Sequence, residues 1–482
     1  MQAPIPRAEG ELNDENLRRL FKDAGDFCTR ELTAGGQSLG AYFIDGLVSG
    51  REIAEYVFKP LHENLHNGTP GELLRQARQG AVYNAVADAC SDLQTAAKKL
   101  VNGFCVVLFP GAGALAFEVK TGEKRGPSEP ETENTAKGPK DAFTETVRTN
   151  TSLLRRHLRT PALRLYETTV GRRSLTNVTV AWIDGLTDPV LVEQMKTRLS
   201  EIDIDGFTTP AAVEEYVTGS RLTAFPLLQY TERTDKFANG LLAGRVGLFV
   251  DGLPLGYLAP VNLGYLMEAA EDRGTDFVSA SFLRILRYFA LFVTLLLPGL
   301  YVAMAEFHQQ MLPTKLLLAI IESKRNVPFP TVFEVLGLLL AFELLQEAGM
   351  ALPQSISQSI SVIGGLVVGT AAVEAKLISP AALIAVAGAG ICGFVMPGKE
   401  LSDAVRIWRL LLTVAASLAG LYGLTVGFLT LVARLSFLES FGIAYLEPFS
   451  SLRSGHAILR PRLVTEKFRD RTLHPQDEKN QL

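Results

Sequence analysis

Long runs without charged residues in the second half of the chain constrain its fold most. Residues 288–305, 377–398 and 410–433 contain no Asp, Glu, Lys or Arg. A helix needs about 20 mostly apolar residues to cross a hydrocarbon layer about 30 Å thick. One such run is compatible with a buried helix of a soluble protein, but three in one region disfavour that alternative. The sequence therefore predicts an α-helical polytopic membrane domain over residues 285–434.

The stretch between the first and second runs is harder to assign. Residues 332–345 are apolar but include Glu334 and Glu343, and Glu347 follows. A charged group inside a membrane is costly, so this stretch is predicted either to re-enter without crossing or to lie against other helices. Residues 348–373 are uncharged, and we expect only their second, more apolar half to span.

The distribution of Lys and Arg predicts that both ends of the membrane domain face the cytosol. Arg284 and Arg287 precede the first run, and the tail at 435–482 is basic. Cytoplasmic flanks of membrane helices are enriched in these residues. Both ends on one side require an even number of crossings, and we expect four. The N-terminal extension, residues 1–35, lacks the apolar segment of a signal peptide, so the soluble region is expected to stay in the cytosol.

The region before the membrane domain is predicted to be α/β, with two subdomains at residues 36–140, including a linker, and 141–284. An Asp-Gly-Leu turn at 45–47 returns at 184–186, about 140 positions later, and a hairpin turn returns with a similar offset. The repeat indicates a duplicated unit; the alternative is that Asp-Gly turns are common after strands. Predicted helices cover 51–65, 81–100, 141–158 and 189–202, and predicted hairpins pair 104–109 with 114–119 and 246–250 with 255–258.

Several function classes find no support in the sequence. The formal net charge of -4 gives no sign of the basic surface that nucleic acids require. The four cysteines have no metal-ligand spacing. The loop at 111–113 lacks the Gly-Lys-Ser/Thr ending of a phosphate loop, so a hairpin turn is the better interpretation. We therefore predict no enzyme activity, no catalytic residues, no metal site and no cofactor.

Small and polar residues in the membrane domain are candidates for an ion route. One helical stripe is small and mildly polar, which fits a narrow pore and equally fits a seam between packed helices. The acidic side chains would bind cations, would pair with Lys or Arg, or would lie at the membrane interface. The stripe comprises Ser357, Ser361, Gly364, Val368 and Ala372, and the acidic candidates are Glu334, Glu343 and Glu347.

Pairs of glycines four residues apart predict close approach of helices. Gly365 with Gly369, and Gly423 with Gly427, have this spacing. The contact is predicted within one subunit or between subunits, and both alternatives stay open. About four spans are too few to enclose a path for a solute, so partners or further copies of the chain would be needed.

Long motifs carry a resemblance to a known family. Residues 361–380 read SVIGGLVVGTAAVEAKLISP, and residues 342–353 read FELLQEAGMALP. LLPGLYVAM at 296–304 and NTSLLRR at 150–156 fit the same pattern. With these motifs the chain resembles the A subunits of the GerA-type spore germination receptors over most of its length. It departs from the family where Lys137, Lys140, Asp141 and Ala142 replace parts of an Arg-rich stretch.

The resemblance implies a fold and a function. It implies a cytosolic two-part α/β domain, a lipid-embedded helical domain, and a role in sensing nutrients and triggering germination. It implies assembly with a permease-like B subunit, a lipoprotein C subunit and further copies of the chain in the spore inner membrane. It also implies a nutrient-gated cation channel whose mobile constriction lies at 361–372, with Val362, Gly365 and Val368 controlling leak. The competing hypothesis is a subunit or regulator of a membrane solute transporter, which inverted repeats would favour, and none is evident.

Overall fold

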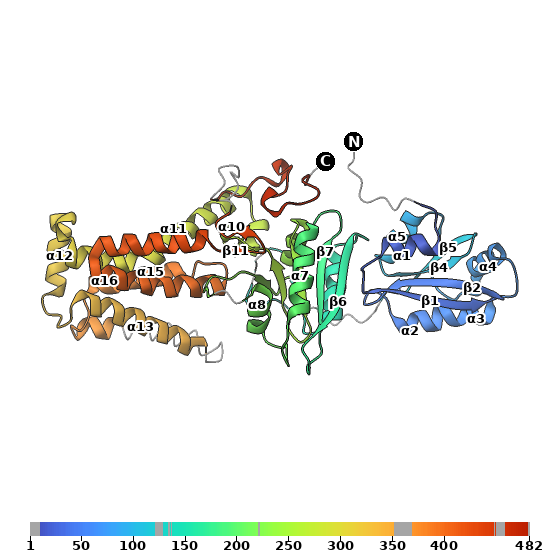
Figure 1. The fold of residues 1–482 in the computed structure, drawn as a ribbon, viewed down its shortest axis with the longest axis horizontal. Helices are drawn as coiled ribbons and strands as arrows, with labels where there is room; N and C mark the ends of the chain where they lie inside the picture. The colour runs from blue at the N-terminus through green and yellow to red at the C-terminus, as the bar shows by residue number, and fades with distance from the viewer. Residues whose placement is uncertain are drawn as a thin grey trace. The chain divides into compact units, whose positions relative to one another are not determined.

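The computed structural model describes residues 10–480 apart from 121–128, 134, 136, 220–221, 351–368, 448 and 450–457. The chain divides into two compact units. The first comprises Met1–Arg221, Leu227–Val261 and Arg462–Leu482, and the second comprises Leu222–Pro226 and Asn262–Pro461. The first unit is α/β and the second is helical, as the sequence predicts (Figure 1).

The first α/β subdomain is an antiparallel five-stranded sheet with helices on both faces (Figure 1). Alternation along the central strand explains the two cores, because successive side chains of a strand point to opposite faces. Phe104, Val106 and Leu108 join the core beneath α1 and α5, whereas Cys105, Val107 and Phe109 join the core beneath α2–α4. The elements are α1 (Asp14–Leu20), β1 (Phe27–Ala34), β2 (Gln37–Ile44), α2 (Gly50–Ile53), η1 (Ala54–Phe58), α3 (Lys59–Asn64), α4 (Pro70–Gln76), η2 (Ala77–Ala81), β3 (Ala87–Cys90), α5 (Leu93–Leu100), β4 (Phe104–Phe109) and β5 (Gly113–Glu118).

The second subdomain repeats this topology. Its strand order is β6-β7-β9-β10-β8, which matches β1-β2-β4-β5-β3 position for position. The preceding helix α6 corresponds to α1, so the repeat extends beyond the sheets and confirms the predicted duplication. The elements are α6 (Val147–His157), β6 (Leu163–Val170), β7 (Thr176–Ile183), α7 (Pro189–Glu201), α8 (Pro210–Thr218), β8 (Gln229–Thr231), α9 (Thr234–Leu242), β9 (Val246–Val250) and β10 (Gly256–Ala259).

Two boundaries in the first subdomain differ from the sequence prediction. The predicted helix at 81–100 is wrong in its first half, because residues 87–90 form strand β3 at the edge of the sheet. The predicted extension at 1–35 contains α1 and β1, so the subdomain begins before residue 36. Short edge strands without an apolar run, such as Ala87–Cys90, carry little periodic signal, which explains the first error.

The first subdomain is joined to the edge strand β6 of the second. The backbone N–H of Gly25 donates to the carbonyl of Leu165 at 2.8 Å, and the N–H of Leu165 donates to the carbonyl of Asp23 at 3.1 Å. Residues 23–25 therefore continue the second sheet by one parallel bridge. These two hydrogen bonds pair backbone N–H and C=O groups at the edge of the sheet that would otherwise have no partner in the sheet.

The linker that the sequence predicts as solvated is partly anchored. Arg233, only 2 % exposed, donates to the carbonyl of Glu133 at 3.2 Å and to that of Pro139 at 2.9 Å. Lys236 pairs with the Glu133 carboxylate at 2.6 Å. These contacts hold the described part of residues 129–140 on the second subdomain.

The C-terminal residues return to the α/β unit. Residues 462–482 belong to the first unit, although they follow the helical unit in the chain. Leu473 is 1 % exposed, and the N–H of Gln476 donates to the carbonyl of Leu186 at 2.8 Å. The tail therefore packs on the second subdomain. It contains η6 (Leu463–Thr465) and η7 (Arg471–Leu473).

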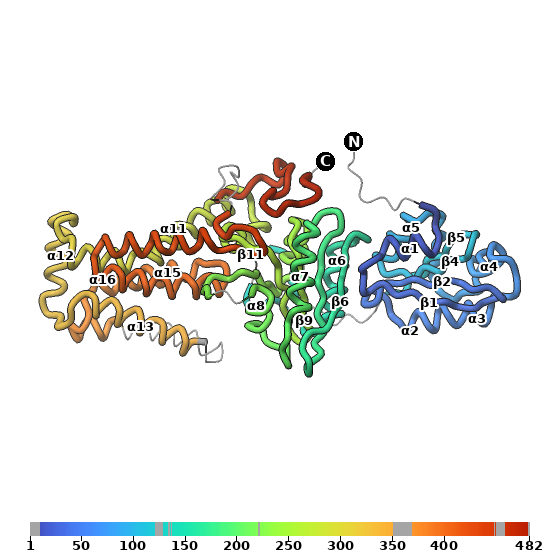
Figure 2. Tube along the Cα trace, viewed as in Figure 1, coloured from blue at the N-terminus to red at the C-terminus, as the bar shows by residue number. Residues whose placement is uncertain are grey.

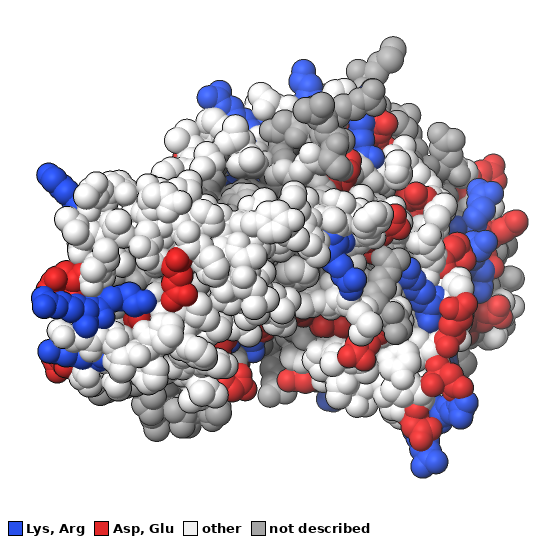
Figure 3. All heavy atoms as spheres, turned by 60° about the vertical axis from the view of Figure 1, so that its left-hand side comes forward, with Lys and Arg blue, Asp and Glu red and all other residues white. Residues whose placement is uncertain are grey.

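The second unit is a bundle of apolar helices, whose path is followed most easily in the tube view (Figure 2). Two helices, Phe277–Phe307 and Lys399–Ser436, are long and apolar enough to cross a membrane, with mean hydropathies of 1.9 and 1.8. On the face of the bundle that Figure 3 shows, most of the surface carries no Lys, Arg, Asp or Glu. Its elements are α10 (Leu263–Leu266), η3 (Ala270–Arg273), α11 (Phe277–Val302), η4 (Ala303–Phe307), η5 (Gln309–Met311), α12 (Thr314–Lys324), α13 (Thr331–Met350), α15 (Pro380–Gly393), α16 (Lys399–Ser436), β11 (Glu439–Ser440) and β12 (Ile443–Ala444).

Candidate ion-binding residues in the helical unit

The direction of each helix follows from contacts along the bundle. We call the end where α11 begins proximal and the end where it finishes distal. The Thr294 hydroxyl of α11 donates to the carbonyl of Ala389 at 3.2 Å, while Val302 packs with Ala382, so α15 runs antiparallel to α11. On α13, Glu334 contacts Ser379 and Phe342 lies against Phe394, so α13 and α15 run parallel, from distal to proximal.

Helix α16 is a hairpin of two helical halves. The backbone leaves the helical region at Ala419, and Gly420 has a φ of 60°. A Cβ on Gly423 would collide with the carbonyl oxygen of Ala415, and one on Gly427 would lie 2.9 Å from Leu412. The two halves are thus packed closely, with glycine required where their backbones meet. Gly423 and Gly427 contact residues of the same chain.

Glu343 is held by two arginines of α16. The Nε of Arg406 donates to Oε2 of Glu343 at 2.7 Å, and further short contacts join Glu343 to the guanidinium groups of Arg406 and Arg409. Arg409 is only 2 % exposed, and Arg406 also binds Asp403 at 2.7 Å. Both carboxylate oxygens of Glu343 are therefore occupied. A buried charge without its partner is strongly destabilising, so this cluster connects α13 to α16.

Glu334 is buried, and only one of its two carboxylate oxygens accepts a hydrogen bond in the described structure. Its side chain has no exposed surface. Oε2 accepts from the backbone N–H of Ser379 at 2.8 Å. Oε1 has no hydrogen-bond partner in the described structure and lies 3.7 Å from Nζ of Lys324. Nearby, the buried hydroxyl of Tyr301 also lacks a hydrogen-bond partner within the described parts of the chain.

The remaining candidates from the sequence divide into two groups. Glu347 is exposed, one turn beyond Glu343 on α13. Ala372 is partly buried within the helical residues 369–374, and a Cβ on Gly369 would lie 3.5 Å from Leu383 near the distal start of α15. The other stripe and constriction residues, Ser357, Ser361, Val362, Gly364, Gly365 and Val368, lie outside the described residues.

The glutamate-bearing stretch 332–345 belongs to a continuous helix, α13, of 20 residues. Of the two predicted alternatives, the structure therefore has the one in which this stretch lies against other helices. Sequence reasoning missed the partners of Glu334 because they are remote: Ser379 is 45 positions away along the chain. No local spacing links Tyr301, Lys324 and Ser379 to this carboxylate.

Arg284 and Arg287 at the start of α11 are also internally paired. Asp272 accepts from Arg287 at 2.7 and 2.8 Å and from Arg284 at 3.1 Å, and Glu268 lies 3.2 Å from Arg284. Asp272 is 1 % exposed and both arginines are buried. The sequence predicts these arginines as the cytosolic flank of the first span. In the structure they pair with Asp272 and so fix the short segment η3 against α11.

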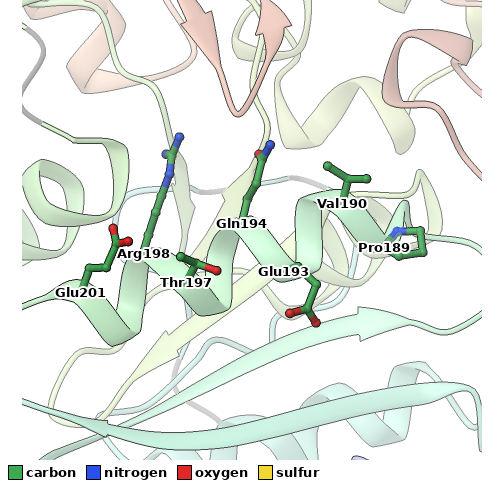
Figure 4. A pocket seen from close by; sticks show the side chains of 7 residues that line it. All are labelled: Pro189, Val190, Glu193, Gln194, Thr197, Arg198 and Glu201. Carbon is green, nitrogen blue, oxygen red and sulfur yellow. The ribbon is translucent and has the colours of Figure 1, made fainter.

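A hollow in the α/β unit lies along the outer face of α7. It has a volume of about 580 Å³ and is lined by Pro189, Val190, Glu193, Gln194, Thr197, Arg198 and Glu201, all from one helix (Figure 4). The amide oxygen of Gln194 is buried without a hydrogen-bond partner among described residues. Within the described chain, no three or more His, Cys, Asp or Glu side chains gather into a metal-binding group.

Two α/β subdomains of equal topology and an apolar bundle with buried carboxylates define a bipartite protein with a membrane-type helical unit. Residues 15–472 match the family described as Bacillus/Clostridium GerA spore germination protein. The chain belongs to the GerA family of spore germination proteins. The resemblance seen in the sequence motifs is confirmed.

Individual relatives match over nearly the whole chain. The "Uncharacterized membrane protein YfkQ" of Bacillus subtilis (strain 168) is 34% identical over 92% of this chain and 86% of its own length. "Spore germination protein KA" of the same organism is 33% identical over 97% of this chain and 88% of its own length. "Spore germination protein GerLA" of Bacillus cereus is 29% identical over 96% and 97%.

Among solved structures, the N-terminal domain of the A subunit of the Bacillus megaterium spore germinant receptor GerK3 aligns with a TM-score of 0.39 and 25% sequence identity. The alignment covers 51% of this chain and 91% of that domain.

Proposed function

We propose that this chain is the A subunit of a nutrient germinant receptor of the spore inner membrane. The observation that carries the proposal is the extent of the family match, which runs from residue 15 to 472 and so includes both units. Relatives named as spore germination proteins are covered over 88% and 97% of their own length. A shared module alone would not produce a match of this extent.

In this proposal the helical unit crosses the bilayer an even number of times. Five described helical segments run along the bundle: α11, α13, α15 and the two halves of α16. The C-terminal residues pack in the same unit as the N-terminal subdomains, which requires an even number of crossings. Both termini then lie in the cytosol.

Copies of the subunit would surround a cation channel. Large apolar side chains are exposed along α11 and α16, Glu334 is buried, and Glu343 pairs with Arg406 and Arg409. Nutrient binding to the receptor would favour an open arrangement through its higher affinity for that state. The residues proposed to line the passage are Ser357, Ser361, Val362, Gly364, Gly365, Val368 and Ala372, with Gly365 and Gly369 as packing positions.

Two partner subunits complete the proposed receptor, a permease-like B subunit and a lipoprotein C subunit. A flux experiment tests the assembly. Liposomes containing the full chain alone, the partners alone, or both together are loaded with rubidium, and nutrient-dependent release is measured. Release that requires the A chain supports the proposal. A strictly monomeric mass in detergent, or equal release without the A chain, would overturn it.

Substitution in the proposed constriction separates a channel from a regulator of transport. Val362→Ala widens a constriction and should increase cation leak without nutrient, whereas Gly365→Leu should reduce nutrient-dependent flux. Val426→Ala is the matched control, because Val426 is 44% exposed on the outer face of α16 and should leave flux unchanged. Equal flux in all three variants rules out this segment as the passage.

A further inference from the structure

We propose that Glu334, Tyr301 and Ser379 form a binding site for one monovalent cation, potassium or sodium, with the Lys324 ammonium as its tethered competitor. The inference deepens the proposed channel function and rests on it for its physiological meaning. Binding itself is measurable without any flux. The site lies at the distal end of the bundle, where α11, α13 and α15 meet.

The carboxylate of Glu334 provides the charge. The side chain has no exposed surface, and its Oε2 is fixed by the backbone N–H of Ser379 at 2.8 Å, at the start of α15. Oε1 has no hydrogen-bond partner in the described residues. A buried ionised oxygen left without a partner is costly, so a site of this kind favours occupancy by a positive group.

A second buried oxygen lies at the same place. The hydroxyl oxygen of Tyr301 has no solvent-exposed surface and lies close to the Ser379 side chain, within electrostatic range of Glu334. The hydroxyl oxygens of tyrosine and serine are neutral acceptors. Together with Oε1 they provide buried oxygen atoms of total charge −1.

The composition of this oxygen set favours a monovalent ion. Calcium takes six to eight oxygen ligands, usually from several carboxylates, and magnesium demands near-octahedral geometry. Glu334 is a single carboxylate, and no cluster of three or more metal-binding side chains is found in the described structure. One negative charge with neutral oxygens balances one positive charge.

The ammonium group of Lys324, a partly exposed side chain, already places one positive charge near Glu334. Its Nζ lies 3.7 Å from Oε1 of Glu334, too far for a hydrogen bond, and donates to the hydroxyl of Thr331. The Lys324 side chain is 26% exposed at the end of α12, so it reaches the buried carboxylate from solvent. A cation and the ammonium would compete for Oε1, since both positive charges cannot be accommodated by one carboxylate.

Ion-dependent thermal stability of the full chain in detergent tests the site. Unfolding is measured in potassium chloride and in N-methyl-D-glucamine chloride at equal ionic strength. The small cation should raise the unfolding temperature, because a ligand that binds only the folded state stabilises it. Glu334→Gln should abolish this difference, and Tyr301→Phe should shift the half-saturating potassium concentration upward. Glu322→Gln is the control, since Glu322 is an exposed carboxylate on α12, 76% exposed.

The lysine variant keeps the test decisive if Glu334→Gln fails to fold. Lys324→Gln removes the competitor and should lower the half-saturating potassium concentration roughly tenfold or more. An unchanged or raised value overturns the site, as does a potassium effect that survives in Glu334→Gln. A normal binding response without nutrient-dependent flux would instead refute the channel and leave the cation site standing.

Discussion

The guanidinium group of Arg155 forms a bidentate and fully buried ion pair with Asp26, with Nε–Oδ2 at 2.8 Å and Nη2–Oδ1 at 2.7 Å. The side chains are 0% and 1% exposed and stand 129 positions apart in the chain. Asp26 precedes β1 of the first subdomain, and Arg155 lies on α6 of the second. The pair therefore fixes the two duplicated subdomains to each other.

Removing one member of this pair should be strongly destabilising. Arg155→Ala leaves the Asp26 carboxylate buried without a partner, and we expect a loss of about 3–5 kcal/mol in the free energy of unfolding. Urea unfolding followed by Trp182 fluorescence, in a Trp408→Phe background, measures it. Arg156→Ala, at the exposed neighbouring position, should change stability by less than about 0.5 kcal/mol. If Asp26→Ala and Arg155→Ala were additive in the double variant, the pair would not be coupled.

A second ion pair predicts how the stability of the α/β unit depends on pH. Nε2 of His157 donates to the Asp141 carboxylate at 2.7 Å. This hydrogen bond raises the pKa of His157 above its ordinary 6.5 and lowers the pKa of Asp141 to about 2. The histidine contribution is present below pH 6.5 and is lost as the pH rises through the raised pKa. The aspartate contribution is present above pH 3.8 and is lost as the pH falls toward 2.

The stabilisation by the pair is therefore largest between these limits. His157→Gln should flatten the pH dependence of the unfolding midpoint on the neutral side, where the wild-type chain loses stability. The exposed His62, whose ring nitrogen contacts only a backbone carbonyl, supplies the matched control His62→Gln. A pH profile of His157→Gln that coincides with that of the wild type would contradict the assignment.

Glycine at 423 should be indispensable for the α16 hairpin. A Cβ there would collide with the carbonyl of Ala415, so Gly423→Val must separate the two halves of the helix. We expect a loss of at least about 1–3 kcal/mol, seen as a lower unfolding temperature in detergent. Gly337→Val is the control, because a Cβ at Gly337 on α13 meets no atom within 4 Å. Equal effects of the two valines would show that the hairpin is not closely packed.

The packing of the tail predicts the sidedness of the chain. In a cysteine-free background, single cysteines at Glu478 and Arg51, both exposed, should be protected from an impermeant maleimide in intact cells. A cysteine at Lys315 on α12, beyond the distal end of α11, should react. Lysed cells provide the control for reactivity. Labelling of the tail and of Lys315Cys from the same side would contradict an even number of crossings.

Local sequence patterns predict many of the helices and strands that the structure contains. The hairpin at 104–109 and 114–119 appears as β4 and β5, and the helix expected at 189–202 appears as α7. The apolar runs at 288–305 and 410–433 lie within α11 and its continuation and within α16. The reversal inside α16 was not foreseen, since a small residue within a long apolar run is compatible with either a straight or a broken helix.

The roles of the candidate site residues, in contrast, could not be predicted from the local sequence. Glu334 and Glu343 are equivalent in sequence, as acidic residues in an apolar stretch. In the structure Glu343 is neutralised by Arg406 and Arg409, whereas Glu334 keeps one oxygen without a hydrogen bond. Their roles differ because their partners come from other helices, and nothing near either glutamate in the chain indicates which partners these are.

The sequence by itself determined the class of each segment: apolar runs, alternating strands, turns, the duplicated α/β unit and the family motifs. These depend on hydrophobic period and backbone preference, which act over a few residues. Only the tertiary structure decided that Asp26 meets Arg155, that the tail returns to the second subdomain, and that Tyr301 and Lys324 surround Glu334. Such pairings depend on how remote segments pack, and the electrostatic free energy of a buried charge depends on the partner that packing brings to it.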